Sequence, residues 1–228
     1  MRSKPLCAII NQKQVDANTT CFREGIWMNI SDLQTAFEKK GYTFRYFGCA
    51  AEAAEYLDQA IDGKTVGFGD SHTLYDMGLY EMLQSHNDVR SPMHLQAGEC
   101  FDEAAKKCVQ TQVYLLSVNG ATEQGEMVNI DGHGNRVACS LYGHEKVYFV
   151  FGVNKIAPTL EEAIWRARNI AAPINAKRLG YKTPCAVKGD RCYDCDSPDR
   201  ICNAMVLHLH KLSRCEVEVI VIGQQLGF

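Results

Sequence analysis

Residues 216–223 read Glu-Val-Glu-Val-Ile-Val-Ile-Gly, a run dominated by β-branched apolar side chains that ends on a glycine. Strands with one face in water alternate apolar and polar residues, whereas strands covered on both faces are apolar almost throughout. The segments 65–69 (TVGFG), 113–118 (VYLLSV) and 146–151 (KVYFVF) have the same apolar character. These four segments therefore predict the interior strands of a mostly parallel sheet covered on both faces.

Helical segments alternate with these strands. An aromatic-rich strand is expected at 42–48, and helices are expected at 31–40, 50–61, 73–84, 99–108 and 159–173. The last of these opens with a capping box of Thr159 and Glu162, and Pro173 follows its expected end. Alternation of this kind predicts an α/β fold in three layers, with a mostly parallel sheet between helices.

One segment departs from this pattern. Residues 127–140, MVNIDGHGNRVACS, alternate apolar and polar on both sides of Asp131-Gly132-His133-Gly134. Two alternating arms around such a turn are typical of a β-hairpin, so an antiparallel excursion is expected here.

Composition limits the class of protein. The chain has 228 residues with a formal net charge of −3, and we expect one domain over residues 1–228. No basic run indicates nucleic-acid binding, and no segment reaches the roughly 20 apolar residues of a membrane span. The apolar run within MRSKPLCAIINQKQ is too short for a signal peptide, so the 11 cysteines indicate a reducing cytoplasm.

Four of the cysteines are concentrated near the end of the chain, in the loop-like stretch 183–203 that contains Pro184, Gly189 and Pro198. They are spaced C-x6-C-x2-C-x6-C and are Cys185, Cys192, Cys195 and Cys202. Thiolates from such a loop could hold a [4Fe–4S] cluster or a structural zinc, and unligated thiols or disulfides are the third possibility. The pattern by itself leaves these three open.

Polar residues follow several of the expected strands. Gly69-Asp70-Ser71 opens a helix, which suits either an anion site or a simple N-cap. Ligands of open α/β sheets gather outside the carboxyl ends of strands, so these residues are candidates for a binding site. Glu123 follows the strand at 113–118 and is placed to act as a general base or as a solvated loop charge.

Cationic side chains lie in similar positions. Lys155 follows the strand at 146–151, Arg136 follows the turn at 131–134, and Arg178 immediately precedes the cysteine stretch. Each could contact the carboxylate of an acid, and each could equally be a surface charge. The chain has no G-x-S-x-G, P-loop, G-x-G-x-x-G or H-E-x-x-H motif, which counts against serine hydrolases, P-loop NTPases, dinucleotide-binding enzymes and zincins.

Several motifs resemble the lactate-utilisation (LUD) domain family. They are GFGDSHTLYDMGL (67–79), SVNGATEQGEMVNIDGHGNRVACSLYG (117–143), VFGVNKI (150–156), AAPINAKRLG (171–180), the cysteine stretch and IGQQLGF (222–228). The resemblance covers roughly residues 30–228. It implies a fold like that of ribose-5-phosphate isomerase, glucosamine-6-phosphate deaminase and the CoA transferases.

The resemblance also implies a function. The family includes subunits of iron–sulfur systems that oxidise lactate, which favours a cluster over zinc at the four cysteines. We therefore expect one small organic acid and one cluster, with a possible redox partner protein and a possible homo-oligomer. The acid would be bound among Ser71, Thr73, Asn119, Thr122, Asp131, Asn135, Arg136, Lys155 and Arg178, with Glu123 as the catalytic carboxylate.

The chain departs from the family pattern at three points. Asn119-Gly120-Ala121-Thr122 stands for an expected Asn-Ala-Ile-Thr, Gly143-His144 for Gly-Pro, and Gly69-Asp70-Ser71 for Gly-Gly-Ser. Asp70 adds a negative charge that argues against phosphate or CoA there. A non-redox isomerase or transferase, with a purely structural cysteine loop, is the first alternative. A non-catalytic assembly subunit is the second.

Overall fold

The structure is a computed structural model that describes residues 20–23 and 26–228, with side chains from Met28 onward. The N-terminal run on which the absence of a signal peptide was predicted lies outside the described residues. A short antiparallel pair, β1 (Thr20–Arg23) and β2 (Ile26–Asn29), precedes the main sheet.

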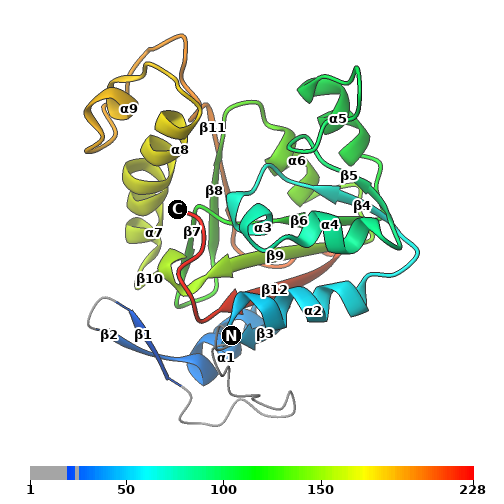
Figure 1. The fold of residues 1–228 in the computed structure, drawn as a ribbon. Coiled ribbons are helices and arrows are strands. Elements are labelled where there is room, and N and C mark those ends of the chain that lie inside the picture. Colours follow the sequence, from blue (N-terminus) through cyan, green and yellow to red (C-terminus); the bar gives the residue numbers. More distant parts are fainter. Residues whose placement is uncertain (1–19, 24–25) are drawn as a thin grey trace, which may run out of the picture.

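A six-stranded sheet forms the centre of the molecule (Figure 1). Its order is β3-β12-β9-β6-β4-β5, and every neighbouring pair is parallel. The strands are β3 (Thr43–Phe47), β12 (Glu216–Ile222), β9 (Lys146–Gly152), β6 (Val113–Leu116), β4 (Thr65–Phe68) and β5 (Asp88–Arg90). The run at 216–223 is thus an interior parallel strand, as its composition predicts.

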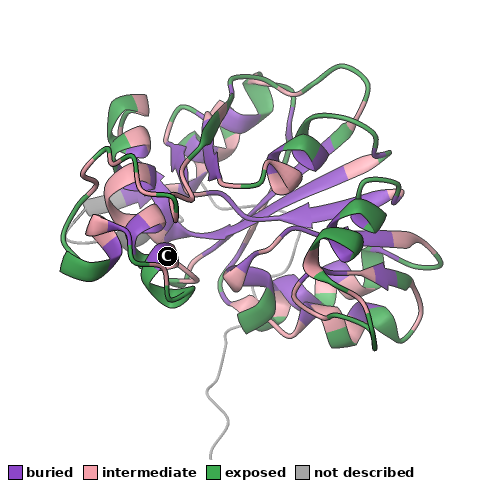
Figure 2. Ribbon diagram, turned by 90° about the horizontal axis from the view of Figure 1, so that it is seen from above, coloured by how far each residue is buried: buried purple, intermediate pink, exposed green. Residues whose placement is uncertain are grey.

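Helices cover both faces of this sheet. On one face, α2 (Ala50–Ala60), α3 (His72–Asp76) and α4 (Leu79–Gln84) pack through one apolar cluster. A second cluster on the opposite face includes residues of α1 (Ile30–Lys39), α5 (Phe101–Cys108) and α6 (Asn135–Leu141). Figure 2 shows the buried strands between helices whose outer sides are exposed. The predicted α/β class with a helix-flanked parallel sheet is confirmed.

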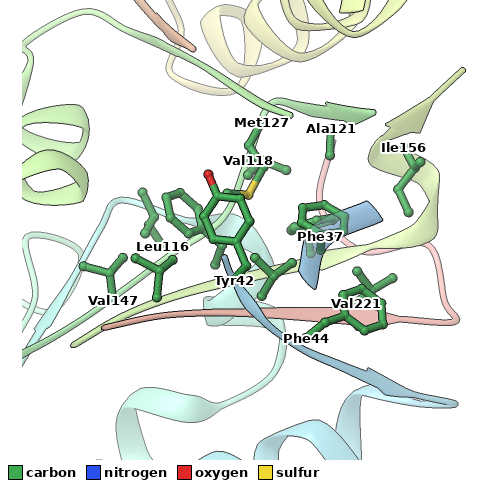
Figure 3. Packing of buried hydrophobic residues seen from close by; sticks show 14 of the residues in the cluster. Phe37, Tyr42, Phe44, Leu116, Val118, Ala121, Met127, Val147, Ile156 and Val221 are labelled. Carbon is green, nitrogen blue, oxygen red and sulfur yellow. The ribbon is translucent and has the colours of Figure 1, made fainter. Parts of the chain in front are cut away.

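A second sheet of four strands lies over the α1 face of the first. Its order is β10-β7-β8-β11, with antiparallel pairing of β8 to both β7 and β11. The strands are β10 (Ile156–Ala157), β7 (Gly120–Thr122), β8 (Met127–Asp131) and β11 (Ala204–His208). Figure 3 shows how Met127, Ala121 and Ile156 of this sheet meet Leu116, Val147 and Val221 of the first.

The hairpin predicted over 127–140 is wrong. Only its first arm is a strand, β8, and the second arm is the helix α6. The turn between them has Gly134 at φ +87°, and the Asp131 carboxylate accepts hydrogen bonds from the backbone N–H groups of His133 and Gly134. Asp-Gly turns occur at strand–helix junctions as well as in hairpins. The seven residues of α6 are too few to distinguish the 3.6-residue repeat of a helix from the two-residue repeat of a strand.

Two helix predictions also need correction. Residues 73–84 form α3 and α4, separated at Gly78, which has φ +66°. Pro173 does not end the helix that begins at Leu160: α7 (Leu160–Arg166) passes through a π-helical turn (Ala167–Ala171) into α8 (Ala172–Arg178). Pro173 occupies the first turn of α8, where its missing N–H costs little. This continuation carries the residues of α8 to the candidate site.

In the part of the chain that the structure describes, no helix combines the length and apolar character that crossing a bilayer requires.

Candidate functional site

A cavity of about 460 Å³ lies at the carboxyl ends of β4, β6 and β9. The loops that follow these three strands form one wall, and the segment after β8 together with α8 forms another. Its volume is in the range usual for small-molecule sites. It is lined by Asp70, Ser71, His72, Cys100, Phe101, Asp102, Ser117, Val118, Asn119, Ile130, Asp131, Gly132, His133, Asn135, Arg136, Lys155, Ala171, Ala172, Asn175, Arg178, Leu179, Tyr181, Ile201 and Phe228.

Most of the predicted binding residues meet at this cavity. Those that line it are Ser71, Asn119, Asp131, Asn135, Arg136, Lys155 and Arg178. Parallel strands end at the same edge of a sheet, which brings together loops far apart in the sequence. Thr73 stands behind the wall, where its hydroxyl accepts a hydrogen bond from Lys155 Nζ at 3.1 Å.

Glu123 and Thr122 do not line the cavity. Asn119 lines the cavity, and the strand β7 that follows it leads away by roughly 3.3 Å per residue. At its far end, Thr122 donates a hydrogen bond to Glu126, and the backbone N–H of Glu123 donates to Ala157. The structure therefore offers Glu123 no contact with a ligand in this cavity.

Arg136 is held firmly in the cavity wall. Its guanidinium donates to the side-chain oxygens of Asn129 (3.0 Å) and Asn119 (2.9 Å) and to the backbone oxygen of Ile130 (2.6 Å). These three acceptors are neutral, and the carboxylate of Asp131, with Oδ2 3.6 Å from Arg136 Nε, balances only part of its positive charge. Because its N–H groups already donate within the protein, Arg136 acts on a ligand mainly through its positive charge.

Asp131 is a buried acceptor at the same wall, with a relative exposure of 7%. Its Oδ1 is used by the turn at His133 and Gly134, but Oδ2 has no hydrogen-bond partner among the described residues. The nearest cationic atom to Oδ2 is Arg136 Nε at 3.6 Å. A buried acceptor without a partner costs roughly 1–3 kcal/mol, and a ligand hydroxyl would relieve that cost.

Lys155 is the most unusual residue of the site. It follows β9 in a short 3₁₀ turn (Val153–Lys155) and is only 4% exposed. Its Nζ donates to the hydroxyls of Thr73 and Ser117, both at 3.1 Å, and no carboxylate of the described residues lies within 4 Å of it. Burial lowers the pKa of Lys155 well below that of an ordinary lysine, and the positive charges of Arg166 and Arg136 lower it further, against a weaker influence of Asp76.

Arg178 lies at the rim of the cavity. Its Nε and Nη2 both donate to the side-chain oxygen of Asn175, and Nη2 is 3.9 Å from a carboxylate oxygen of Asp70. The side chain remains 30% exposed. The Arg178 guanidinium can therefore turn toward an incoming carboxylate, while Asp70 beside it disfavours a ligand of higher negative charge.

Sequence patterns missed several parts of the site. Arg166, buried within α7, donates to the backbone oxygens of Asn154 and Asn119, and it reaches the cavity wall only through tertiary packing. Ser117 directly follows β6 and carried no motif signal of its own. The segment after β12 folds back over Lys155, with the backbone N–H of Leu226 donating to Asn154 Oδ1 at 3.1 Å. The motif 222–228 was noted in the sequence, but nothing in it predicted this position.

The cysteine stretch flanks the cavity through Ile201, and Tyr181, two residues before the stretch, also lines it. Cys185 lies on α9 (Pro184–Lys188), and its sulfur is 3.2 Å from the hydroxyl of Thr183. Burial raises the pKa of the Cys202 thiol, and the nearby thiols of Cys192 and Cys195 raise it further.

The donor chemistry of the four thiols suits iron–sulfur or zinc, but their arrangement does not form a coordination site. Within residues 28–228, no group of three or more His, Cys, Asp or Glu side chains is placed to hold a metal ion. Arg168, 3.7 Å from the Cys192 sulfur, and Arg200 supply positive charge beside the thiols. The loop would have to rearrange to bring all four sulfurs onto one centre.

The chain is similar to known proteins in structure and in sequence. A crystal structure of a DUF162 family protein from Deinococcus radiodurans is similar, with a TM-score of 0.49 and 14% identity over 85% of this chain and 95% of that chain. No curated protein matches the sequence. The LUD domain profile matches residues 30–222, which is most of the chain. The chain therefore belongs to the LUD domain family.

Proposed function

We propose that this protein binds a small organic acid with an oxygen on the carbon next to its carboxyl group, a 2-hydroxy or 2-oxo acid. The observation that carries this proposal is the pairing of positive side chains with an unsatisfied buried acceptor in one cavity. Arg178 at the rim and the fixed charge of Arg136 favour a carboxylate. Asp131 Oδ2, which lacks a hydrogen-bond partner among residues 28–228, favours a hydroxyl beside it.

Each residue then has a defined task. Arg178, steadied by Asn175, binds the carboxylate, and its exposure allows the side chain to move onto the ligand. Asp131 lines the cavity and its buried Oδ2 has no hydrogen-bond partner among residues 28–228, so it accepts a hydrogen bond from the 2-hydroxyl and replaces Glu123 as the candidate general base. Ser117 and Lys155 supply further hydrogen-bonding groups at the inner wall.

A panel of acids tests this function. Lactate, glycolate, pyruvate and longer 2-hydroxy acids should bind and raise the thermal stability of the chain, whereas propionate should bind more weakly. Arg178→Gln should weaken binding about ten- to a hundredfold, the value of a hydrogen bond to a charged group. Arg214→Gln, which removes an exposed arginine elsewhere, is the matched control and should bind as the wild type does.

Asp131→Asn separates the two contacts. The amide retains an oxygen for the turn at His133 and Gly134 but removes the charge that faces Arg136, so thermal melting is used to check that the variant is folded. The preference for lactate over propionate should shrink about tenfold, the value of one lost hydrogen bond. If no acid of the panel binds the wild type, or if Arg178→Gln and Arg214→Gln bind equally, the proposal is wrong.

We further propose that the protein takes part in the oxidation of such an acid, with Cys185, Cys192, Cys195 and Cys202 as ligands of an iron–sulfur cluster. Its support is the four-thiol spacing and the contact of the loop with the cavity. When bound, a cluster would accept electrons or pass them to a partner protein. Oxygen-free purification followed by iron, sulfide and zinc analysis tests this part separately: zinc or no metal would favour a non-redox enzyme on the same fold.

A further inference from the structure

The environment of Lys155 favours the neutral amine over the charged ammonium ion. The side chain is 4% exposed, its Nζ lies between two hydroxyls, and the ion pairs of the described residues do not include it. A buried ammonium ion is normally paired with a carboxylate, because an isolated charge is costly to remove from water. The neutral amine is a nucleophile, and catalytic lysines gain this property in low-polarity or positively charged surroundings.

The hydroxyls of Ser117 and Thr73 complete this arrangement. The two oxygens lie 3.3 Å apart, and each is 3.1 Å from Nζ. Hydroxyl groups donate as well as accept, so they can orient the amine in either protonation state and exchange protons with it. Lys155 lines the cavity proposed to bind the acid, which places the amine beside the ligand.

We propose that Lys155 condenses with the carbonyl carbon of a 2-oxo acid bound in this cavity and forms a Schiff base. The nitrogen attacks the carbonyl carbon, a C=N bond replaces the C=O bond, and the oxygen leaves as water with the two amine protons. No oxidant or reductant is consumed. This inference rests on the proposed function, since it uses the same cavity and narrows the ligand to the 2-oxo acids.

The charges around Lys155 select the ligand. A protonated Schiff base is positive, and Arg136 and Arg166 already place positive charge near Nζ. A simple aldehyde would add to that repulsion. A 2-oxo acid brings its own carboxylate next to the new bond and offsets it, so 2-oxo acids should react in preference to aldehydes or ketones without an acid group.

Reductive trapping tests the proposal. The full chain is incubated at pH 6.5 with pyruvate or glyoxylate and sodium cyanoborohydride, digested and mapped by mass spectrometry. The peptide carrying Lys155 should gain the mass of the acid less one oxygen atom. It should be labelled several-fold faster than peptides of exposed lysines, because the cavity holds the acid beside Nζ and burial favours the neutral amine. Propanal should label Lys155 no faster than the exposed lysines.

Matched variants control the experiment. Lys155→Arg and Lys155→Met should lose the label, and Lys188→Arg, an exposed lysine of α9, should retain it. Circular dichroism and thermal melting establish that the Lys155 variants are folded. Labelling spread evenly over surface lysines, or equal labelling of Lys155→Arg and the wild type, overturns the inference.

Binding without the reductant separates this inference from the proposed function. If pyruvate stabilises the wild type against heat and lactate displaces it, but no adduct is trapped, the Schiff base is refuted and the acid site stands. If neither acid binds and no adduct forms, both proposals fail. An adduct on Lys155 that lactate suppresses supports both.

Discussion

Two buried ionisable side chains lie near opposite ends of the central sheet and meet opposite surroundings. Glu218, toward the amino end of β12, is 1% exposed and accepts hydrogen bonds from Arg45 (2.7 Å), Tyr56 (2.7 Å) and Lys146 (2.8 Å). Lys155, beyond the carboxyl end of β9, has two hydroxyl partners, and no carboxylate of the described residues lies within 4 Å. The first charge is fully paired, and the second is not.

The contrast extends to their protonation. Burial alone would raise the pKa of the Glu218 carboxyl, but the hydrogen bonds from Lys146 and Tyr56 outweigh it and hold the pKa below its ordinary value. For Lys155, burial and the nearby arginines both act to lower the pKa. A paired buried charge helps to fix the fold, whereas an unpaired ionisable group in a cavity is available to a ligand.

The largest effect is expected when the paired charge is removed. Glu218→Leu should lower the free energy of unfolding by about 2–3 kcal/mol, because it leaves Arg45 and Lys146 without their carboxylate. Loss of a partner from a fully enclosed pair costs more, ~3–5 kcal/mol, but Arg45 is 39% exposed and can turn to water. Urea denaturation measures the change. Glu216→Leu, at the exposed start of the same strand, should change it by less than about 0.5 kcal/mol, and equal losses would contradict the comparison.

A smaller loss is expected where the C-terminal segment covers Lys155. Gly227 has φ +57°, and a Cβ there would lie 2.6 Å from Thr73 Oγ1 and 3.2 Å from Lys155 Nζ. Gly227→Ala should lower stability by about 2 kcal/mol, combining backbone strain with this clash. Gly180→Ala, at φ +76° with open space around it, carries the strain alone and should lose about 1 kcal/mol. Equal thermal shifts of the two variants would show that the segment does not press on the lysine.

Removal of the unpaired group should change stability least. Lys155→Met keeps the chain length without the amine, and the free energy of unfolding should stay the same or rise by up to about 1 kcal/mol. The hydroxyls of Ser117 and Thr73 still have each other as partners at 3.3 Å. Urea denaturation at pH 7 measures the free energy of unfolding. A loss of 2 kcal/mol or more, comparable to that of Glu218→Leu, would mean that Lys155 is a structural residue.

The smallest effect is expected in the pH dependence of the folding stability. Because the pKa of Glu218 is lowered in the folded chain, its stabilising contribution is complete above the ordinary glutamate pKa and is lost as the pH falls through the folded value. Glu218→Gln should therefore lose less stability than the wild type between neutral pH and pH 3. If the melting temperatures of Glu218→Gln and the wild type fall by the same amount over this pH range, the carboxylate is not held in its charged form.

The sequence predicted the residues of the cavity better than the elements that carry them. Asp131 and Arg136 line the cavity although the predicted hairpin is wrong, because the turn between them exists in either arrangement. Arg178 lies there only because the helix continues past Pro173. Glu123 has the right chemistry for a base, but the short strand β7 carries it away. The residue types of a loop can be read from the local sequence, whereas the position of the loop in the fold depends on packing.

What the sequence determined by itself was the interior of the sheet and the sites where polar loops interrupt it, since apolar β-branched runs have one favourable place in a folded chain. Only the tertiary structure decided which charges are paired. Glu218 meets Arg45 from 173 residues away, and Lys155 meets Thr73 from 82 residues away. The pKa of a buried group depends on such distant neighbours, so the contrast between these two side chains exists only in the folded molecule.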